Sequence, residues 1–172
     1  MFSGLITTFH TFQDRLWKIR PVFECFTKQF RAIYTPTKNV CVDETLFHYR
    51  GRHNAVHFIP SKRARFGLKA FKLCQSDGEA GGYTVSMKLV MGDDPKHPPA
   101  FTRIPLELLD SAGLSYLGYE MYTDNWYTSP TLFHQLQARK TGAVGTVKTT
   151  RRFMPRDLNV TKPGDVDFRC VF

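Results

Sequence analysis

Three strand-like segments follow one another in the middle of the chain, and this order limits the possible folds more than any other feature. They read VCVDETLFHY (residues 40–49), RFGLKAFKLCQ (65–75) and GYTVSMKLVMG (82–92). β-branched and aromatic residues favour extended structure in each of them. The turn-rich SDGEAGG joins the second to the third and predicts a hairpin. The three segments therefore predict an antiparallel meander.

Helical and strand-like segments alternate after this meander. PLELLDSAG (105–113) and TSPTLFHQLQARKTG (128–142) have helical patterns, and LGYEMYT (117–123) and AVGTVKTT (143–150) are strand-like. Ser129 stands at the N-cap of the second helix, Pro130 at its first position and Gly142 at its expected end. One further strand is expected to begin at Val166. Strands separated by helices join a sheet in parallel. The order thus predicts an α/β, ribonuclease H-like mixed sheet with flanking helices, in which three antiparallel strands precede two parallel additions and strands one and four are neighbours.

The segment before the first strand has a helical pattern. Helical spacing relates Phe9, Phe12 and Leu16, and a second helix is expected to begin at Pro21. This second helix carries an apolar face that predicts packing, formed by Phe23, Phe26, Phe30 and Ile33. A chain of 172 residues suffices for one domain with a core. We expect a helical lead-in over 1–38, used for packing, DNA binding or dimerisation, and the α/β core over 39–172.

The distribution of charge indicates an anionic partner. The net charge is +9, and no acidic residue lies between Thr45 and Ser76, although seven basic residues do. A stretch with charges of one sign favours nucleic acid, while the alternative, solvated faces of strands, stays open. No apolar run is long enough for a membrane span. A membrane partner is not expected, because the basic residues do not lie on an amphipathic helix. The residues expected to bind DNA are Arg50, Arg52, Lys62, Arg63, Arg65, Lys69, Lys148, Arg151 and Arg152.

Two aspartates occupy positions that such a sheet would bring together. Asp43 lies on the first strand, and Asp124 directly follows the fourth. Carboxylates at the ends of adjacent strands suit Mg²⁺, whose remaining ligands are water and phosphate, and paired ions can assist phosphoryl transfer. Because Ser129 already caps the helix, Asp124 is a turn former, a solvated loop residue or a functional carboxylate. Asp43 and Glu44 point to opposite faces of a regular strand, so only one of them can face the ion, and geometry leaves this choice open. An ion pair with the arginines that follow is the expected role of Glu44.

Three motifs resemble those of the piggyBac-type DDE/D transposases. VDETLFHYRGRHNAVHFIPSKRARFGLKAFKLCQS resembles the first catalytic block, with an aspartate-glutamate strand, R-G-R, I-P-x-K and G-x-K. YTDNWYTSPTLFHQL resembles the second block, and TGAVGTVKTTRRFMP resembles the G-x-x-G-T-V/I-R strand with its basic tail. The resemblance extends from about Leu16 to about Pro155.

This resemblance implies part of a transposase catalytic domain that cleaves and joins DNA at transposon ends with Mg²⁺, in the nucleus. It implies that Asp43 and Asp124 are catalytic metal ligands, that transposon ends and target DNA are the partners, and that the full-length protein is a homodimer. The family's third carboxylate belongs to a later G-G-V-D segment, which these residues lack. We therefore expect a core incomplete at its C-terminus and a chain that does not cleave DNA by itself. The alternative is a domesticated, transposon-derived DNA-binding or chromatin-associated protein without catalysis.

Overall fold

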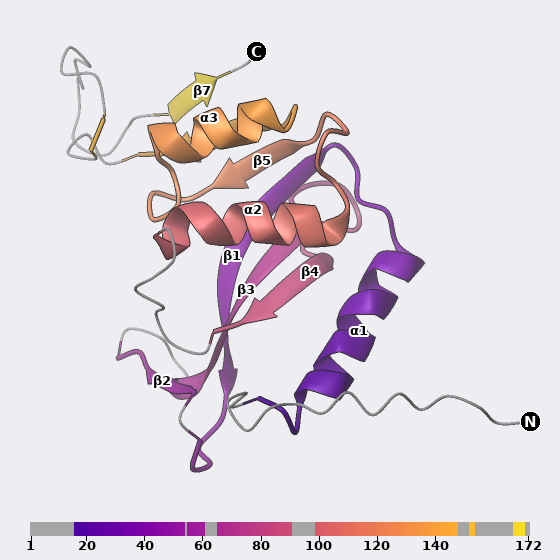
Figure 1. Ribbon diagram of the computed structural model, residues 1–172, viewed down its shortest axis with the longest axis vertical. Coiled ribbons are helices and arrows are strands. Elements are labelled where there is room, and N and C mark those ends of the chain that lie inside the picture. The colour runs from indigo at the N-terminus through magenta and orange to yellow at the C-terminus, as the bar shows by residue number, and fades with distance from the viewer. Residues whose placement is uncertain are drawn as a thin grey trace, which may run out of the picture.

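A mixed sheet of seven strands forms the centre of the protein (Figure 1). The computed structural model describes residues 16–53, 55–60, 65–90, 99–147 and 152–153, and the backbone of 167–170. In chain order the elements are α1 (Arg20–Ile33), β1 (Asn39–His48), β2 (Val56–Phe58), β3 (Phe66–Gln75), β4 (Thr84–Leu89), α2 (Ala100–Ala112), β5 (Glu120–Thr123), α3 (Pro130–Ala138), β6 (Gly142–Thr146) and β7 (Asp167–Cys170).

The order of the strands confirms the predicted topology. It is β2-β3-β1-β5-β6-β7, with β4 also paired to β3. β1, β3 and β4 pair antiparallel, as the meander required. β5 lies parallel to β1, and β6 lies parallel to β5, so the first strand adjoins the first parallel addition. β7 begins within one residue of the expected position and runs antiparallel to β6. This arrangement is consistent with the ribonuclease H-like fold.

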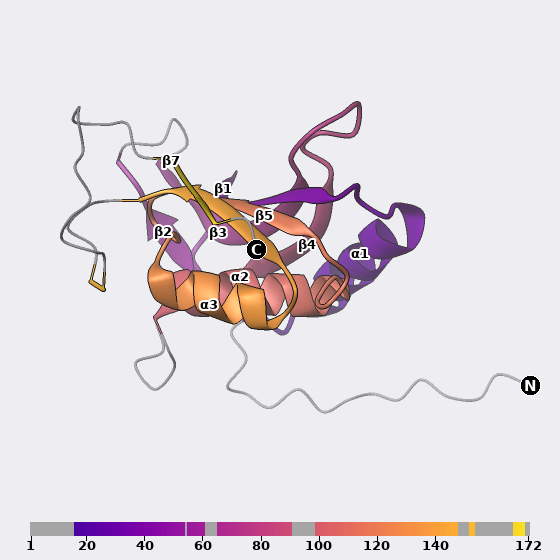
Figure 2. The same cartoon turned by 90° about the horizontal axis from the view of Figure 1, so that it is seen from above.

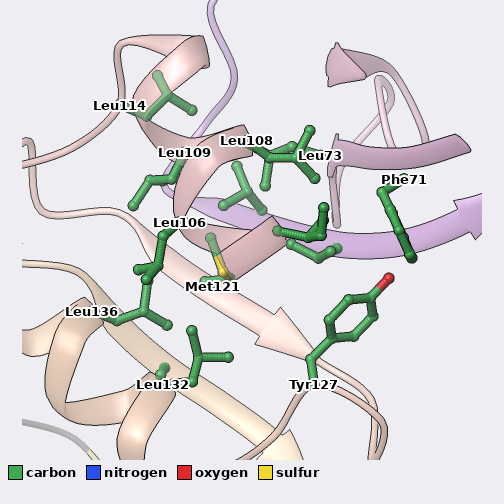
Figure 3. Close-up of a cluster of buried hydrophobic side chains, with 14 of the residues drawn as sticks. Phe71, Leu73, Leu106, Leu108, Leu109, Leu114, Met121, Tyr127, Leu132 and Leu136 are labelled. Carbon is green, nitrogen blue, oxygen red and sulfur yellow. The ribbon is translucent and has the colours of Figure 1, made fainter. Parts of the chain in front are cut away.

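The hydrophobic core lies between the sheet and two helices on one of its faces. Figure 2 shows α2 and α3 together on this face, and no helix among the described residues lies across the other, which we call the open face. Figure 3 shows the core side chains, including Leu73 and Met121 from the sheet and Leu109 and Leu136 from the helices, all four fully buried. None of the described helices is long and apolar enough to cross a membrane.

Burial alternates along β1 and orients its aspartate. Val40 and Val42 are buried in the core, whereas Cys41 is half-buried and Asp43 is exposed. Successive side chains of a strand point to opposite faces. Asp43 therefore faces away from α2 and α3, on the open face.

The start of α2 and the end of α3 differ from the expected positions. α2 begins at Ala100 and contains Pro105, which the sequence reasoning placed at the helix start. Burial of Thr102 and Ile104 in the core favours the additional turn, although an interior proline lacks the N–H of one helical hydrogen bond. α3 ends at Ala138 rather than near Gly142, because Lys140 adopts a left-handed conformation (φ 53°) that reverses the chain earlier.

The apolar face of α1 is not buried. The helix itself was predicted correctly from Pro21 to Ile33, and it begins one residue earlier. None of its residues is buried, and Phe26 and Ile33 are 56% and 73% exposed. Its Phe30 packs edge-on against Tyr83 at the start of β4. The pattern of Phe9 and Phe12 lies outside the described residues.

Candidate metal and DNA site

The parallel register of β1 and β5 relates the positions of Asp43 and Asp124. Cys41 pairs with Tyr122, an offset of 81 residues (122 − 41). Asp43 and Asp124 have the same separation (124 − 43) and lie two residues beyond the last pair of this register. Adjacent strands lie about 4.8 Å apart. Both aspartates are exposed, which leaves them accessible to solvent and to a large ligand.

Asp124 also shapes the turn that follows β5. Its Oδ1 accepts hydrogen bonds from the backbone N–H groups of Trp126 (2.9 Å) and Tyr127 (3.3 Å). Its carbonyl oxygen accepts from the backbone N–H and the hydroxyl of Thr128. Asp124 is thus a turn former, one of the three roles left open by the sequence. Within the described part of the chain its Oδ2 takes part in no hydrogen bond or ion pair, so the turn engages one carboxylate oxygen only.

Asp43 shares its surroundings with a lysine and two thiols. Across the antiparallel pair of β1 and β3 it faces Lys72, and Cys41 faces Cys74. Burial is the largest cause that raises the pKa of the Cys41 thiol, followed by Cys74 and Asp43, whereas Lys72 lowers it. Among the described residues Asp43 makes no side-chain hydrogen bond or ion pair. Lys72, which we did not include among the expected DNA contacts, is therefore the basic residue that the register places beside it.

Glu44 lies on the opposite face and forms an ion pair. Its carboxylate lies 2.6 Å from the Nζ of Lys69 on β3. The same Nζ lies 4.8 Å from the ring centroid of Phe71 and 5.4 Å from that of Trp126. Among the described residues this ion pair is with Lys69 of the neighbouring strand. A role of Lys69 in DNA binding stays a prediction.

Tyr127 is buried directly after the Asp124 turn. The residue is 2% exposed, and its hydroxyl has no hydrogen-bond partner among the described residues. Burial is the largest cause that raises the pKa of this phenol, and Glu44, Asp124 and Asp43 raise it further. Figure 3 shows its ring beside Phe71 at the edge of the core. The sequence did not single out this residue. Its only signal was its position next to Trp126, in the aromatic pair that follows Asp124.

Comparison with known proteins identifies the family. The chain matches the family described as Transposase IS4 over residues 7–169. The chain belongs to this transposase family. Among solved structures it is similar to a piggyBac transposase in a synaptic complex with hairpin DNA, with 27% sequence identity and a TM-score of 0.73. The similarity covers 83% of this chain and 30% of that transposase, so the chain spans less than a third of its length. The piggyBac-type resemblance of the sequence is confirmed.

The transposase motif G-x-x-G-T has a physical basis in this structure. Its second glycine, Gly145 on β6, lies against the end of β5. A Cβ atom added there would lie 2.6 Å from the carbonyl oxygen of Thr123 and would also clash with the Thr128 hydroxyl. The hydroxyls of Thr123 and Thr128 are themselves 2.8 Å apart and buried. Glycine at this position therefore allows β6 to support the turn that holds Asp124.

The helix after this turn is capped as the sequence predicted. The Ser129 side chain accepts a hydrogen bond from the backbone N–H of Leu132 at 3.2 Å. Pro130 occupies the first turn, where no N–H is needed. Leu132 and Leu136 are fully buried in the core and fix the helix against the sheet. The capped helix and β6 thus hold the Asp124 turn from both sides.

The basic residues expected to bind DNA lie in two regions. Arg50, Arg52 and Arg65, which we call the loop arginines, are exposed in the connection between β1 and β3. A hydrogen bond from Tyr49 N–H to the Phe66 carbonyl joins the two ends of this connection. Arg152 is exposed and stacks on Phe153. The other expected contacts lie outside the described residues: Lys62, Arg63, Lys148 and Arg151.

The two aspartates fit a hydrated divalent cation. In the parts of the chain that the structure describes, no three His, Cys, Asp or Glu side chains form a group that could hold a metal ion. Asp43 and Oδ2 of Asp124 are nevertheless hard oxygen donors that no other described group engages. A cation that retains several waters needs only one or two protein carboxylates. The donor set therefore fits Mg²⁺ or Mn²⁺ with a mostly aqueous shell, and not a closed zinc site.

Proposed function

We propose that this chain is a segment of a piggyBac-type transposase catalytic core. It binds transposon-end and target DNA, and in a complete core it contributes to metal-assisted cleavage and strand transfer. The observation that supports this proposal most strongly is the parallel pairing of β1 and β5, whose register offset equals the separation of Asp43, within β1, and Asp124, directly after β5. Membership of a transposase family and similarity to a piggyBac transposase agree with it.

The open face supplies groups for both the phosphate and the cation. Asp43 and Asp124 would hold a divalent cation, Mg²⁺ by resemblance, which polarises the phosphate and stabilises charge on the leaving oxygen. Lys72, opposite Asp43 in the register, is placed to contact a phosphate beside that cation. The loop arginines lie in the connection that follows β1 and would hold the DNA backbone without reading its sequence. One face thus combines phosphate binding with metal binding.

Two carboxylates alone are expected to bind a cation loosely. Mg²⁺ loses its waters reluctantly, so a site with two protein ligands leaves the attacking oxygen poorly aligned. A misplacement of about 1 Å can reduce the rate on the order of a hundredfold. We therefore expect the 172-residue chain to bind DNA without cleaving it. The alternative function, a transposon-derived DNA-binding protein that does not use a metal, also predicts binding without cleavage.

Metal binding separates these two functions. We would titrate the chain with Mn²⁺ and follow the loss of the free-ion signal by electron paramagnetic resonance. Under the transposase proposal, wild type binds Mn²⁺, and Asp43→Asn and Asp124→Asn each lose that binding. The matched control is Asp110→Asn, a carboxylate of α2 that faces Arg139 and Ser115, and it should bind Mn²⁺ as wild type does. DNA binding without any Mn²⁺ binding would favour the alternative.

A further inference from the structure

A small cavity lies outside the site described above. It is formed by the segment directly before α1, the loop after β1 and the start of β3, which Figure 1 shows at the same end of the sheet. Six of the residues that line it are Leu16, Trp17, Ile19, Tyr49, His53 and Leu68. We call this cavity the loop pocket. Its volume is about 300 Å³, at the lower end of the range of about 300–1,000 Å³ for ligand sites, so it suits one flat ring system rather than a helix or a strand.

The loop pocket is separate from the two aspartates but lies along the same strand as Lys72. Lys72 faces Asp43 across the pair of β1 and β3, and Leu68 of the pocket precedes it on β3. The step from Leu68 to Lys72 spans about 13 Å along the strand. Because the two residues are an even number of positions apart, both side chains project to the open face. A DNA strand that passes the aspartates can therefore reach the pocket without crossing the sheet.

Two accessible aromatic rings line the loop pocket. Trp17 is 54% exposed and Tyr49 is 41% exposed, whereas Leu16, which also lines the pocket, is buried. Nucleobases stack on such rings whatever their sequence, since every base has a π-face. The Nδ1 of His53 accepts a hydrogen bond from the Ala55 backbone N–H at 3.0 Å, so the neutral imidazole carries its proton on Nε2. The pocket therefore combines ring faces with a hydrogen-bond donor.

The same short loop carries the pocket residues and two basic side chains. It reads YRGRH (49–53), and its arginines, Arg50 and Arg52, are both exposed. A Cβ atom at Gly51 would overlap the hydroxyl end of the Tyr49 ring, so glycine allows this ring to lie against the backbone between the arginines. The Tyr49 N–H also donates to the Phe66 carbonyl at 3.2 Å, which holds the start of the loop. The ring and the two positive charges are thus presented together.

We propose that the loop pocket binds a single unpaired nucleobase of a bound DNA strand, which stacks on Trp17 and Tyr49. Arg50 and Arg52 contact the phosphates on either side of that base, and the exposed Lys18 adds positive charge at the rim. Bases within a duplex are stacked on one another, and an unpaired base costs least to move out of the stack. The inference rests on the proposed function, to which it adds a base-binding site away from the aspartates.

The test uses two DNA duplexes that differ by one unpaired 5-iodouracil in the middle of one strand. The affinity of the 172-residue chain for each duplex is measured by fluorescence anisotropy of an end label. Wild type should bind the duplex with the unpaired base at least about fivefold more tightly, because loss of one stacked base typically weakens binding about 5- to 150-fold. Irradiation joins 5-iodouracil to an aromatic ring stacked on it, and mass spectrometry should locate the new bond at Trp17 or Tyr49.

Three variants separate the base contact from the phosphate contacts. Tyr49→Ala should bind the two duplexes equally, because it removes a ring on which the base stacks. The matched control is Tyr116→Ala, an exposed tyrosine between α2 and β5, and it should keep the preference for the unpaired base. Replacing Arg50 and Arg52 together by alanine should weaken binding to both duplexes alike and keep the preference.

Two results on wild type would overturn the inference and leave DNA binding standing, and neither depends on whether a variant folds. Equal affinity for the two duplexes would show that no unpaired base enters the pocket. A cross-link found only at aromatic residues elsewhere, such as Trp126, would place base stacking outside the pocket. Wild type that binds neither duplex would instead reject the DNA binding of the proposed function, and this inference with it.

Discussion

The two roles of Asp124 can be separated by two substitutions at the same position. Its Oδ1 accepts two backbone hydrogen bonds in the turn, while the metal hypothesis requires the negative charge of the carboxylate. Asparagine keeps an accepting Oδ1 and loses the charge, whereas alanine loses both. A side chain that accepts backbone N–H bonds in this way contributes about 0.5–2 kcal/mol to the free energy of unfolding. For Asp124→Ala, which loses both hydrogen bonds, we expect the free energy of unfolding to fall by about 1.5 kcal/mol. For Asp124→Asn we expect a fall of less than about 0.5 kcal/mol, because the charge of an exposed carboxylate contributes little to stability.

These values convert into measurable changes in Tm. For a domain of this size, 1 kcal/mol corresponds to a change of about 2–4 °C. Asp124→Ala should therefore unfold about 3–6 °C below wild type by circular dichroism, and Asp124→Asn within about 2 °C of wild type. Both variants should lose Mn²⁺ binding. Equal destabilisation by both substitutions would refute the account of the turn, and Mn²⁺ binding retained by Asp124→Asn would refute the role in metal binding.

Other parts of the chain provide further tests. Changing all three loop arginines to alanine should weaken binding to every DNA sequence alike and reduce the log–log salt slope by about 0.9 per lost phosphate contact; an unchanged slope in filter binding would show that this loop is only solvated. Gly145→Ala should lower the free energy of unfolding in urea by about 2–3 kcal/mol, because the new Cβ would lie 2.6 Å from the Thr123 carbonyl oxygen; a wild-type midpoint would mean that β5 and β6 separate easily. The 172-residue chain should bind a labelled DNA hairpin in Mg²⁺ and leave it intact; cleavage that disappears in Asp124→Asn would reveal a further carboxylate ligand within the chain.

The sheet could be predicted because its signals are local and mutually consistent. Each main strand is a run of β-forming residues, and turn residues or a helix lie between successive runs. The alternation Val40, Cys41, Val42, Asp43 indicates which side chains face the core once one face is covered. β2 was not predicted, because three residues are too few to show an alternating pattern. This strand forms by pairing with β3.

The ends of helices and the cover of helical faces could not be predicted in the same way. Pro105 has the residue type of a first helical position, but burial of the preceding turn outweighs the hydrogen bond that proline removes. Lys140 ends α3 in a conformation that glycine usually adopts, so composition alone gave the wrong position. The spacing of Phe26 and Ile33 establishes that α1 has an apolar face, but spacing carries no information about what lies against that face.

The candidate site was predictable to the extent that it follows from strand order. β5 lies parallel beside β1, and the offset of this register equals the separation of Asp43 and Asp124. Tyr127 depends on a different kind of information. Its ring enters the core on one side of the sheet, while its neighbour Asp124 stays exposed. That difference arises from the Asx turn, in which one carboxylate oxygen binds the backbone N–H groups of the two aromatic residues that follow. The same turn therefore leaves Oδ2 of Asp124 without a contact among the described residues, while it directs the Tyr127 ring into the core.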